Sequence, residues 1–347
     1  MALALALKLH GVTAEVFEAR DRAAVCRDAR VLALSDGARQ ILEWLGVWSK
    51  CPATPIETIH ISQRGGFGRS CLRAAELDLT ALGWVLPAGD LIAALAGALA
   101  EAGIVYRENT KADRTSTVAF PLTAFAEGAV DAGSGSVRDY GQHAVLCSVS
   151  VAAPHRNVAW ERFTGEGPVA LLPLGERYAV VLTCADDAVA ELMSADDAAF
   201  LALLQQRFGT RHRFTATGPR TARPLGLRYR PDPVGERQVW LGNAAQTLHP
   251  VAGQGFNLAL RDIWELAQAL AAAADPGAPE VLADYARGRR ADRIGAIRFT
   301  DLLLDSFTSG FAPLRHARGA GLLALDLLPP LRNFVAKRMI YGARAWP

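Results

Sequence analysis

The sequence predicts an α/β fold with an α+β part, on three observations. Residues 2–18 have the pattern of a helix followed by a strand, residues 242–262 that of a turn opening into a helix, and residues 144–184 that of several short strands. The first two patterns are typical of α/β units and the third of a separate sheet. The 347 residues, 51% of them hydrophobic, suffice for roughly two domains with substantial cores.

The first element is an apolar helix over residues 2–10, which Gly11 ends, and a strand follows over residues 13–18. This is the second half of a dinucleotide-binding βαβ unit, in which an acid follows a glycine-rich loop by about 20 residues and binds a ribose. Glu18 therefore places the loop at or just before Met1. We expect the chain to lack the loop and its strand, through a start codon assigned too late or a truncated gene product.

The middle of the chain predicts helices and strands of both kinds of domain. Residues 56–72 alternate in strand character and have glycines at bends, which predicts that the chain enters a second sheet here. Helices are expected at residues 36–48, 90–102 and 196–208, and a strand at 104–107.

The motif at residues 242–262 reads GNAAQTLHPVAGQGFNLALRD and follows a strand that ends at Trp240 and Leu241. Gly253 and Gly255 bracket Gln254 at the point where a helix must begin. Apolar residues then recur at steps of three or four, as in an amphipathic helix. The first N–H groups of a helix are unpaired and carry partial positive charge, so this turn favours an electron-rich ligand.

The motif resembles the second flavin-contact segment of the single-component FAD-dependent aromatic hydroxylases. The resemblance is closest to the ubiquinone-biosynthesis hydroxylases, above all the group that acts on 2-polyprenyl-6-methoxyphenols. Four further segments match that family in the same order: DARVLALSDG at 28–37, IHIS at 59–62 with GFG at 66–68, DYGQ at 139–142 and WERFTGEGPVALLPL at 160–174. The resemblance covers most of the chain and implies a Rossmann-like FAD-binding domain, N-terminally truncated, interleaved with a β-sheet substrate domain and followed by C-terminal helices.

The resemblance implies roles for residues outside the glycine turn. Glu18 corresponds to the ribose-binding acid, and Arg30 to an arginine whose planar fork suits a pyrophosphate. Asn243 replaces the aspartate of the wider family and retains a hydrogen bond to a ribityl hydroxyl. A surface arginine remains the alternative for Arg30, and an exposed strand end for Glu18.

The turn itself supplies the remaining cofactor residues. N–H donors there would stabilise negative charge on a reduced flavin ring, with a helix start that binds no ligand as the alternative. The residues expected around the isoalloxazine are Pro250, Gly253, Gln254, Gly255 and Asn257. His249 either faces the ring or holds the turn, and we expect Asp262 at the helix surface or in an interdomain hydrogen bond.

The implied reaction is hydroxylation of a polyprenylated phenol in ubiquinone biosynthesis, with FAD, O₂ and NAD(P)H as a transient reductant. In this family a flavin C4a-hydroperoxide transfers the hydroxyl group. The sequence identifies no catalytic acid or base and no metal ligands. Two alternatives stay open: a flavin-free remnant that acts as a binding or scaffold subunit, and a related flavoprotein that oxidises or reduces a lipid without hydroxylating it.

The predicted domains are discontinuous. Residues 1–58, 85–137 and 223–274 form the FAD-binding domain, residues 59–84 and 138–222 the substrate domain, and residues 275–347 a helical region. Residues 108–138 depart from the family pattern, since Ala132 stands where a glycine is expected after Asp131. A Cβ at a left-handed position there would be strained.

The composition limits which binding partners and which cellular compartment the protein can have. A formal charge of +2 argues against a nucleic-acid surface, and five scattered cysteines favour neither disulfides nor zinc. We expect a cytoplasmic protein, with contact to the inner membrane or a ubiquinone-biosynthesis assembly as an open alternative. The C-terminal helices, with Arg332, Lys337, Arg338 and Arg344, either dock on a membrane or partner or simply pack with a solvated basic rim.

Overall fold

The computed structural model describes residues 1–112, 119–130, 133–308 and 312–342. The expectation for Asp131 and Ala132 and that for Arg344 lie outside these ranges. The chain separates into two compact units, one of residues 1–52, 86–138 and 227–296 and the other of residues 53–85, 139–226 and 297–347. No helix in the described ranges is both long and apolar enough to cross a membrane.

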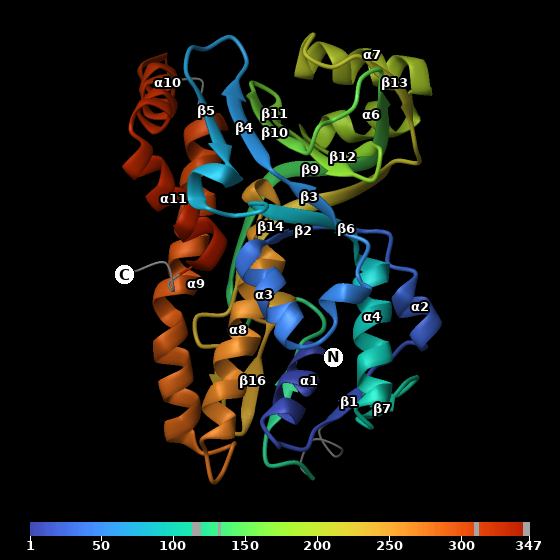
Figure 1. Ribbon diagram of the computed structural model, residues 1–347, viewed down its shortest axis with the longest axis vertical. Coiled ribbons are helices and arrows are strands. Elements are labelled where there is room, and N and C mark those ends of the chain that lie inside the picture. Colours follow the sequence, from blue (N-terminus) through green and yellow to red (C-terminus); the bar gives the residue numbers. More distant parts are fainter. Residues whose placement is uncertain (113–118, 131–132, 309–311, 343–347) are drawn as a thin grey trace. The chain divides into compact units, whose positions relative to one another are not determined.

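The first unit contains the two predicted α/β patterns (Figure 1). Its helices are α1 (Ala2–Leu9), α2 (Arg22–Cys26), α3 (Asp36–Trp44), α4 (Ala88–Glu101), α8 (Gln254–Ala271) and the first part of α9 (Pro279–Thr308). Its strands are β1 (Glu15–Phe17), β2 (Val31–Ser35), β7 (Val105–Arg107), β8 (Thr123–Phe125), β15 (Val234–Gly235), β16 (Gln238–Trp240) and β17 (Gln246–Thr247). The helices expected at residues 2–10, 36–48 and 90–102 are confirmed.

Two small sheets carry the parallel pairings of the first unit. β1 pairs in parallel with β7, so that Val16 lies opposite Tyr106. β16 pairs in parallel with β8, so that Val239 lies opposite Ala124, and β15 closes the other edge of that sheet. Parallel pairing of short strands joined through helices is the α/β signature that the sequence predicts.

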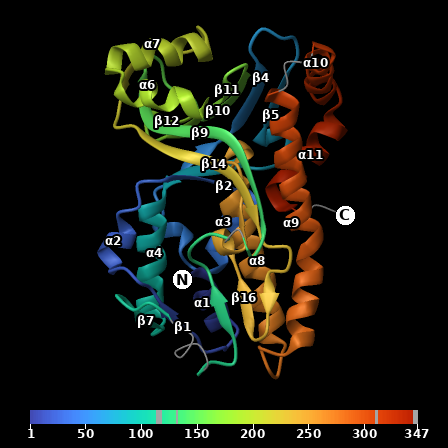
Figure 2. The same ribbon diagram turned by 180° about the vertical axis from the view of Figure 1, so that it is seen from behind.

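The second unit is built on antiparallel strands, and Figure 2 shows it from the opposite side. Its strands are β3 (Thr54–Ile56), β4 (Thr58–Gln63), β5 (Arg69–Arg73), β6 (Gly83–Pro87), β9 (Ser136–Val151), β10 (Val158–Thr164), β11 (Gly167–Leu174), β12 (Arg177–Ala185), β13 (Phe214–Thr217) and β14 (Thr221–Tyr229). Its helices are α6 (Val189–Ser194), α7 (Asp197–Phe208), α10 (Ala312–Leu327) and α11 (Pro329–Tyr341). The strands β6, β9 and β14 and the helix α9 run from one unit into the other.

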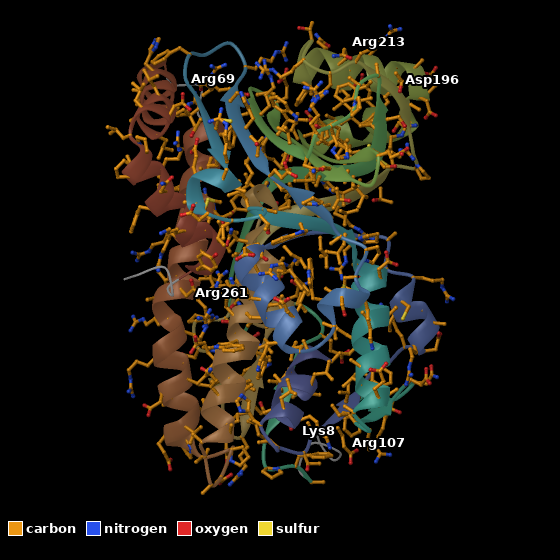
Figure 3. The ribbon with its side chains drawn as sticks, in the orientation of Figure 1. Lys8, Arg69, Arg107, Asp196, Arg213 and Arg261 are labelled. Atoms are coloured by element: carbon orange, nitrogen blue, oxygen red, sulfur yellow. The ribbon has the colours of Figure 1, made fainter. Side chains whose placement is uncertain are left out.

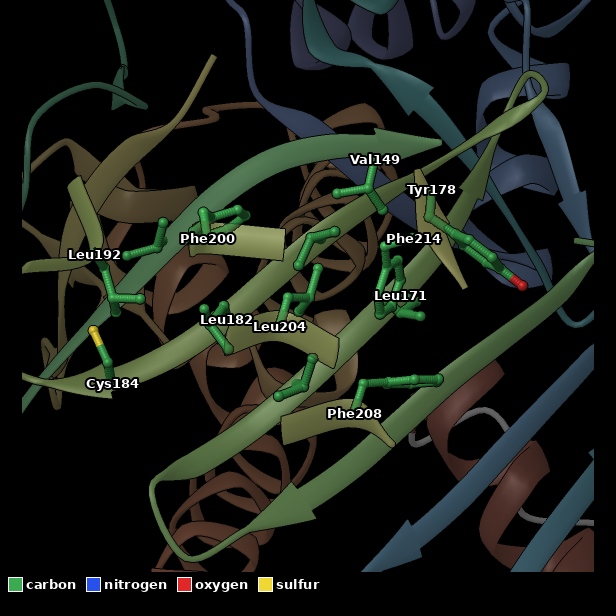
Figure 4. Close-up of a cluster of buried hydrophobic side chains, with 13 residues drawn as sticks. Val149, Leu171, Tyr178, Leu182, Cys184, Leu192, Phe200, Leu204, Phe208 and Phe214 are labelled. Carbon is green, nitrogen blue, oxygen red and sulfur yellow. The ribbon is translucent and has the colours of Figure 1, made fainter. Parts of the chain in front are cut away.

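The large sheet of the second unit has the core order β9-β12-β11-β10-β4-β5. The expectation of short strands over 144–184 is wrong for β9, which extends over 16 residues. One face of this sheet packs against α7, where Phe200, Leu204 and Phe208 meet Leu171 and Leu182 (Figure 4). Along β9, β11 and β12 alternate residues point to this core. The other face is covered in part at β4, where Ile61 packs against a cluster that includes Ala336 and Ile340.

Candidate functional site

The motif at 242–262 folds in the first unit as the sequence predicts. β16 ends at Trp240, a turn over Val251–Gly253 follows β17, and α8 begins at Gln254. Gly253 precedes the helix in the left-handed conformation, with φ +60°. A side chain here would be strained by its backbone conformation, and its Cβ would lie 3.4 Å from Cβ of Ala33. The turn therefore depends on glycine at position 253.

The start of α8 is open to a ligand. No side chain caps the helix, and no acidic residue lies in its first turn. A Cβ built on Gly255 would meet no atom within 4 Å. The N–H groups of a helix start carry partial positive charge, so an electron-rich group can approach this backbone closely.

Asn257 fastens the turn to strand β2. Its Oδ1 accepts a hydrogen bond from the amide of Ser35 at 2.9 Å, and its Nδ2 donates to the carbonyls of Ala33 at 3.0 Å and of Gly253 at 2.7 Å. The residue is only 3% exposed. Because these bonds use both amide hydrogens, the side chain of Asn257 holds Gly253 in position and has no amide hydrogen left to donate elsewhere.

His249 fixes the beginning of the same turn. Its Nδ1 accepts a hydrogen bond from the amide of Val251 at 3.1 Å. Burial lowers the pKa of its imidazole to about 4, so the ring is neutral at physiological pH. A neutral ring that accepts at Nδ1 carries its proton on Nε2. This contact gives His249 a structural function in the turn.

Asn243 and Pro250 are both exposed. Pro250 has φ −67° at the start of the turn, which its ring enforces. The side chain of Asn243 makes no hydrogen bond within the described ranges, and is therefore available to a ligand.

Glu18 follows β1 and lies beside the amino end of α1. Burial lowers the pKa of the Met1 amine to about 6, and the Glu18 carboxylate acts in the opposite direction, which indicates their proximity. Oε1 of Glu18 accepts bonds from the amide and Nε of Arg20 at 3.0 and 3.1 Å. An acid after a strand and next to a helix start is the arrangement expected of a ribose-binding residue.

Arg30 is paired with Asp28. Its NH2 lies 2.6 Å from Oδ2 of Asp28, and its side chain is 58% exposed. The hydrogen bonds that Arg30 donates to Asp28 raise the pKa of the Arg30 guanidinium despite partial burial. Glu18, Arg30 and Asn243 make no hydrogen bond with the turn group of Gly253, Gln254 and Asn257 in the part of the chain that the structure describes. A pyrophosphate would have to compete with Asp28 for Arg30.

A network of buried ion pairs joins α8, the helix of the motif, to α9. The sequence analysis did not predict this network. Asp262 accepts bonds from Nε of Arg289 and from Nε2 of Gln246, both at 2.7 Å. Asp292 accepts from Nε of Arg261 at 2.8 Å and from NH2 of Arg289 at 2.6 Å. Asp262 is 1% exposed, so the expected position at the helix surface is wrong.

Arg293 extends the network to the strand side of the motif. It donates from Nε to Oε1 of Gln246 at 2.8 Å and from NH2 to the carbonyl of Arg230 at 2.7 Å. Helices α8 and α9 lie side by side at this point, where Figure 3 labels Arg261. The spacing of Arg289, Asp292 and Arg293 along one helix face could have indicated the network, but such charges are more often solvated.

The described ranges contain no cluster of three or more His, Cys, Asp or Glu side chains suited to a metal ion. The five cysteines are free.

Comparison with known proteins identifies the family. The family described as "FAD binding domain" matches residues 123–300. The chain is 32% identical to ubiquinone hydroxylase UbiL of Rhodospirillum rubrum, over 99% of this chain and 88% of the relative. It is 28% identical to 3-demethoxyubiquinol 3-hydroxylase of Escherichia coli, over 97% and 94% of the two chains.

A solved structure with the same fold is that of Pseudomonas aeruginosa PqsL in complex with 2-aminobenzoylacetate. It has a TM-score of 0.71 and 19% identity, over 92% of this chain and 95% of that one. The fold, the glycine turn at α8 and the full-length similarity agree. The chain belongs to the FAD-dependent ubiquinone-biosynthesis hydroxylase family.

Proposed function

We propose that this protein is a monooxygenase that hydroxylates the aromatic ring of a polyprenylated phenol during ubiquinone biosynthesis. FAD is its cofactor, NAD(P)H its transient reductant and O₂ its oxidant. The names of its relatives support the ubiquinone assignment, since one is a ubiquinone hydroxylase and another a demethoxyubiquinol hydroxylase. The reductant and the phenol class follow from the family resemblance.

The open glycine turn at the start of α8 carries the proposal. It fits a flavin ring because the helix start is uncapped and a Cβ on Gly255 would meet no protein atom. The amides around Gly253, Gln254 and Gly255 would hold the ring, while Asn257 keeps them in place. When bound, the flavin supplies the oxygen-transfer chemistry.

The remaining cofactor residues have distinct tasks in this proposal. Glu18 binds the adenosine ribose, Arg30 the pyrophosphate after release from Asp28, and Asn243 a ribityl hydroxyl. The neutral His249 neither gives nor takes a proton near pH 7, and holds the turn. Protein groups around the substrate orient its ring and exclude water.

The decisive experiment is FAD titration of the wild type, a Gly255→Leu variant and a matched Gly97→Leu variant. Gly97 lies inside α4 with equally open space around its Cβ position. We expect Gly255→Leu to weaken FAD binding at least roughly tenfold, by filling the space against the helix start. The Gly97→Leu variant should bind as the wild type does. A wild type that stays colourless in excess FAD would instead support the scaffold alternative.

The reaction itself is tested by reconstituting the wild type with FAD and supplying NADH or NADPH, ¹⁸O₂ and a 2-methoxy-6-prenylphenol. Incorporation of one labelled oxygen atom into the ring supports hydroxylation. Oxidation of the phenol without incorporation of labelled oxygen would instead support the alternative of a flavoprotein that oxidises a lipid without hydroxylating it.

An exposed apolar corner on the second unit would suit a protein that takes a polyprenylated substrate from a membrane. The corner between α10 and α11 exposes Leu327 at 66%, Leu328 at 52% and Phe334 at 47%. Lys337, one turn after Phe334, is also exposed. Apolar side chains beside a cation favour an anionic lipid surface, and we assign that partner to the corner.

Vesicle sedimentation tests this surface. Wild type should bind vesicles of phosphatidylcholine and phosphatidylglycerol, and a variant with both Leu327→Ser and Leu328→Ser should bind at least roughly tenfold more weakly. Leu302→Ser is the control, because Leu302 is 64% exposed on α9. Equal binding of all three proteins would contradict the assignment.

A further inference from the structure

The large sheet of the second unit has a second face, opposite the one that packs against α7. Trp160, Leu171 and Val180 point to the core cluster against α7. Their neighbours along each strand therefore point to the opposite face. The strand register aligns six of these neighbours in one cross-strand row: Ser70, Ile61, Glu161, Ala170, Val181 and Leu146.

The row is aliphatic except at two positions. Ala170, Val181 and Leu146 are partly exposed, whereas Ile61 packs against a cluster that includes Ala336 and Ile340. The accessible part of the face therefore begins at Glu161. Ser70, at the end of the row, is fully buried, and its hydroxyl has no hydrogen-bond partner in the described chain. Glu161 alone brings an ionisable group to the accessible part.

The carboxyl group of Glu161 is surrounded by apolar neighbours. Its direct cross-strand partners are Ile61 and Ala170. No hydrogen bond or ion pair to its carboxylate occurs within the described ranges, although the residue is partly exposed. Burial alone raises the pKa of Glu161 to about 7. An ionised carboxyl group among apolar neighbours and without a hydrogen-bond donor destabilises the folded chain, unless a ligand donates a hydrogen bond to it.

On the partly exposed side of this carboxyl group the cross-strand neighbour is Ala170, whose side chain is a single methyl group. A methyl side chain next to Glu161, followed by Val181 and Leu146, forms a shallow aliphatic surface that can accept a flat ring. The hydrogen-bond acceptor beside this aliphatic surface is the Glu161 carboxylate, and one such acceptor matches a ring that carries one hydroxyl group. A polyhydroxylated or charged ligand would leave polar groups against aliphatic side chains.

We propose that the Glu161 carboxylate accepts a hydrogen bond from the hydroxyl group of a phenol whose ring lies on this aliphatic row. The inference rests on the proposed function and deepens it, because it assigns the residue that distinguishes a phenol from its ether. Glu161 is then a substrate-binding residue, and the bond draws electron density toward the ring oxygen. Hydrogen bonds to a charged acceptor are the strong ones in such sites.

The test compares two probes at pH 8, a 2-methoxy-6-prenylphenol and its O-methyl ether, by calorimetric titration. The ether lacks the hydroxyl proton and keeps the ring and the prenyl group. Wild type should prefer the phenol roughly tenfold or more. Glu161→Leu should bind the two probes within about twofold of each other, and Glu161→Gln, whose amide oxygen is a weaker acceptor, should lie between.

Glu166→Gln is the matched control, since Glu166 lies at the turn after β10 with a side chain 48% exposed. It should keep the wild-type preference. A Glu161→Leu variant that keeps the preference, or a wild type that shows none or binds neither probe, would overturn the inference. FAD titration of the same samples tests the proposed function separately. The isosteric Glu161→Gln variant shows whether a change in Glu161→Leu comes from the lost carboxylate or from misfolding caused by leucine.

Discussion

The two units of this protein hold their helices by opposite means. In the first unit, α8 meets α9 through buried ions, with Arg261, Asp262 and Arg289 each at most 5% exposed. In the second unit, α7 meets its sheet mainly through an apolar cluster that includes Phe200 and Leu204 (Figure 4), with one hydrogen bond from Arg207 to the carbonyl of Thr183. Both interfaces are buried, but directional bonds dominate only the first.

This difference follows from what each helix must position. Hydrogen-bonded ions fix a helix in both rotation and translation, because each bond requires its own distance and angle. Apolar packing tolerates small shifts and volume-conserving exchanges. The ionic interface lies in the helix that begins at the glycine turn, where the backbone geometry has to be kept. The apolar interface supports one face of the large sheet, whose geometry is already set by the pairing of its strands.

The largest expected effect is from Asp292→Asn. Loss of this carboxylate leaves Arg261 and Arg289 without their shared counter-ion in a buried site, which costs about 3 to 5 kcal/mol in free energy of unfolding. Urea unfolding measures it. Asp284→Asn is the control on the same helix, since its pair with Arg287 is exposed at 70% and 75%, and it should cost less than about 1 kcal/mol. Equal costs for the two would contradict the ionic interface.

The apolar interface should respond to volume and little to chemistry. Leu204→Ala should lower the free energy of unfolding by about 2 to 5 kcal/mol through the cavity it leaves. Leu204→Met conserves the volume and should cost less than about 1.5 kcal/mol. If Leu204→Met were as damaging as Leu204→Ala, the cluster would be as directional as the network, and the comparison would fail.

Glu161 gives a pH-dependent effect of intermediate size. Its pKa of about 7 in the folded chain stands above the ordinary 4.5, so ionisation favours unfolding. The stability present below pH 4.5 is lost as the pH rises through 7. Glu161→Gln should therefore raise the free energy of unfolding at pH 8 by about 1 to 3 kcal/mol and change it little at pH 4.5. A pH-independent difference in urea unfolding would argue against a desolvated carboxyl group.

The smallest expected effects distinguish the two glycines of the turn. Gly253→Ala should cost about 1 to 2 kcal/mol, because an alanine side chain strains a left-handed backbone. Gly255→Ala should change the stability of the flavin-free protein by less than about 1 kcal/mol, since the site is helical and open. Thermal unfolding without FAD measures both. Equal costs would show that the turn differs from this description.

Local patterns predicted much of the first unit and the family. Helical periodicity predicted α3 and α8, because burial of one face leaves its period in the sequence, and the Ala- and Leu-rich composition of residues 2–10 predicted α1. The glycine turn at Gly253 and Gly255 was also predicted, because few residues tolerate such a backbone. The roles of the individual cofactor residues stay predictions.

Contacts between distant segments were beyond local patterns. Asp262 and Arg289 form a pair across 27 positions, and a charge on a helix has the same sequence pattern whether it is solvated or buried with a partner. The strand register that places Glu161 beside Ala170 depends on pairings over the whole sheet. Such pairings become visible only once the strands are assembled.

The threefold bonding of Asn257 has a consequence for the ageing of the protein. Hydrolysis of its amide would replace one nitrogen by oxygen and add about one dalton to the chain. Two donated bonds, to the carbonyls of Ala33 and Gly253, would become contacts between oxygen atoms that repel one another. A change nearly invisible to gel analysis would thus loosen the glycine turn, and the helical backbone around Asn257 is what slows that reaction.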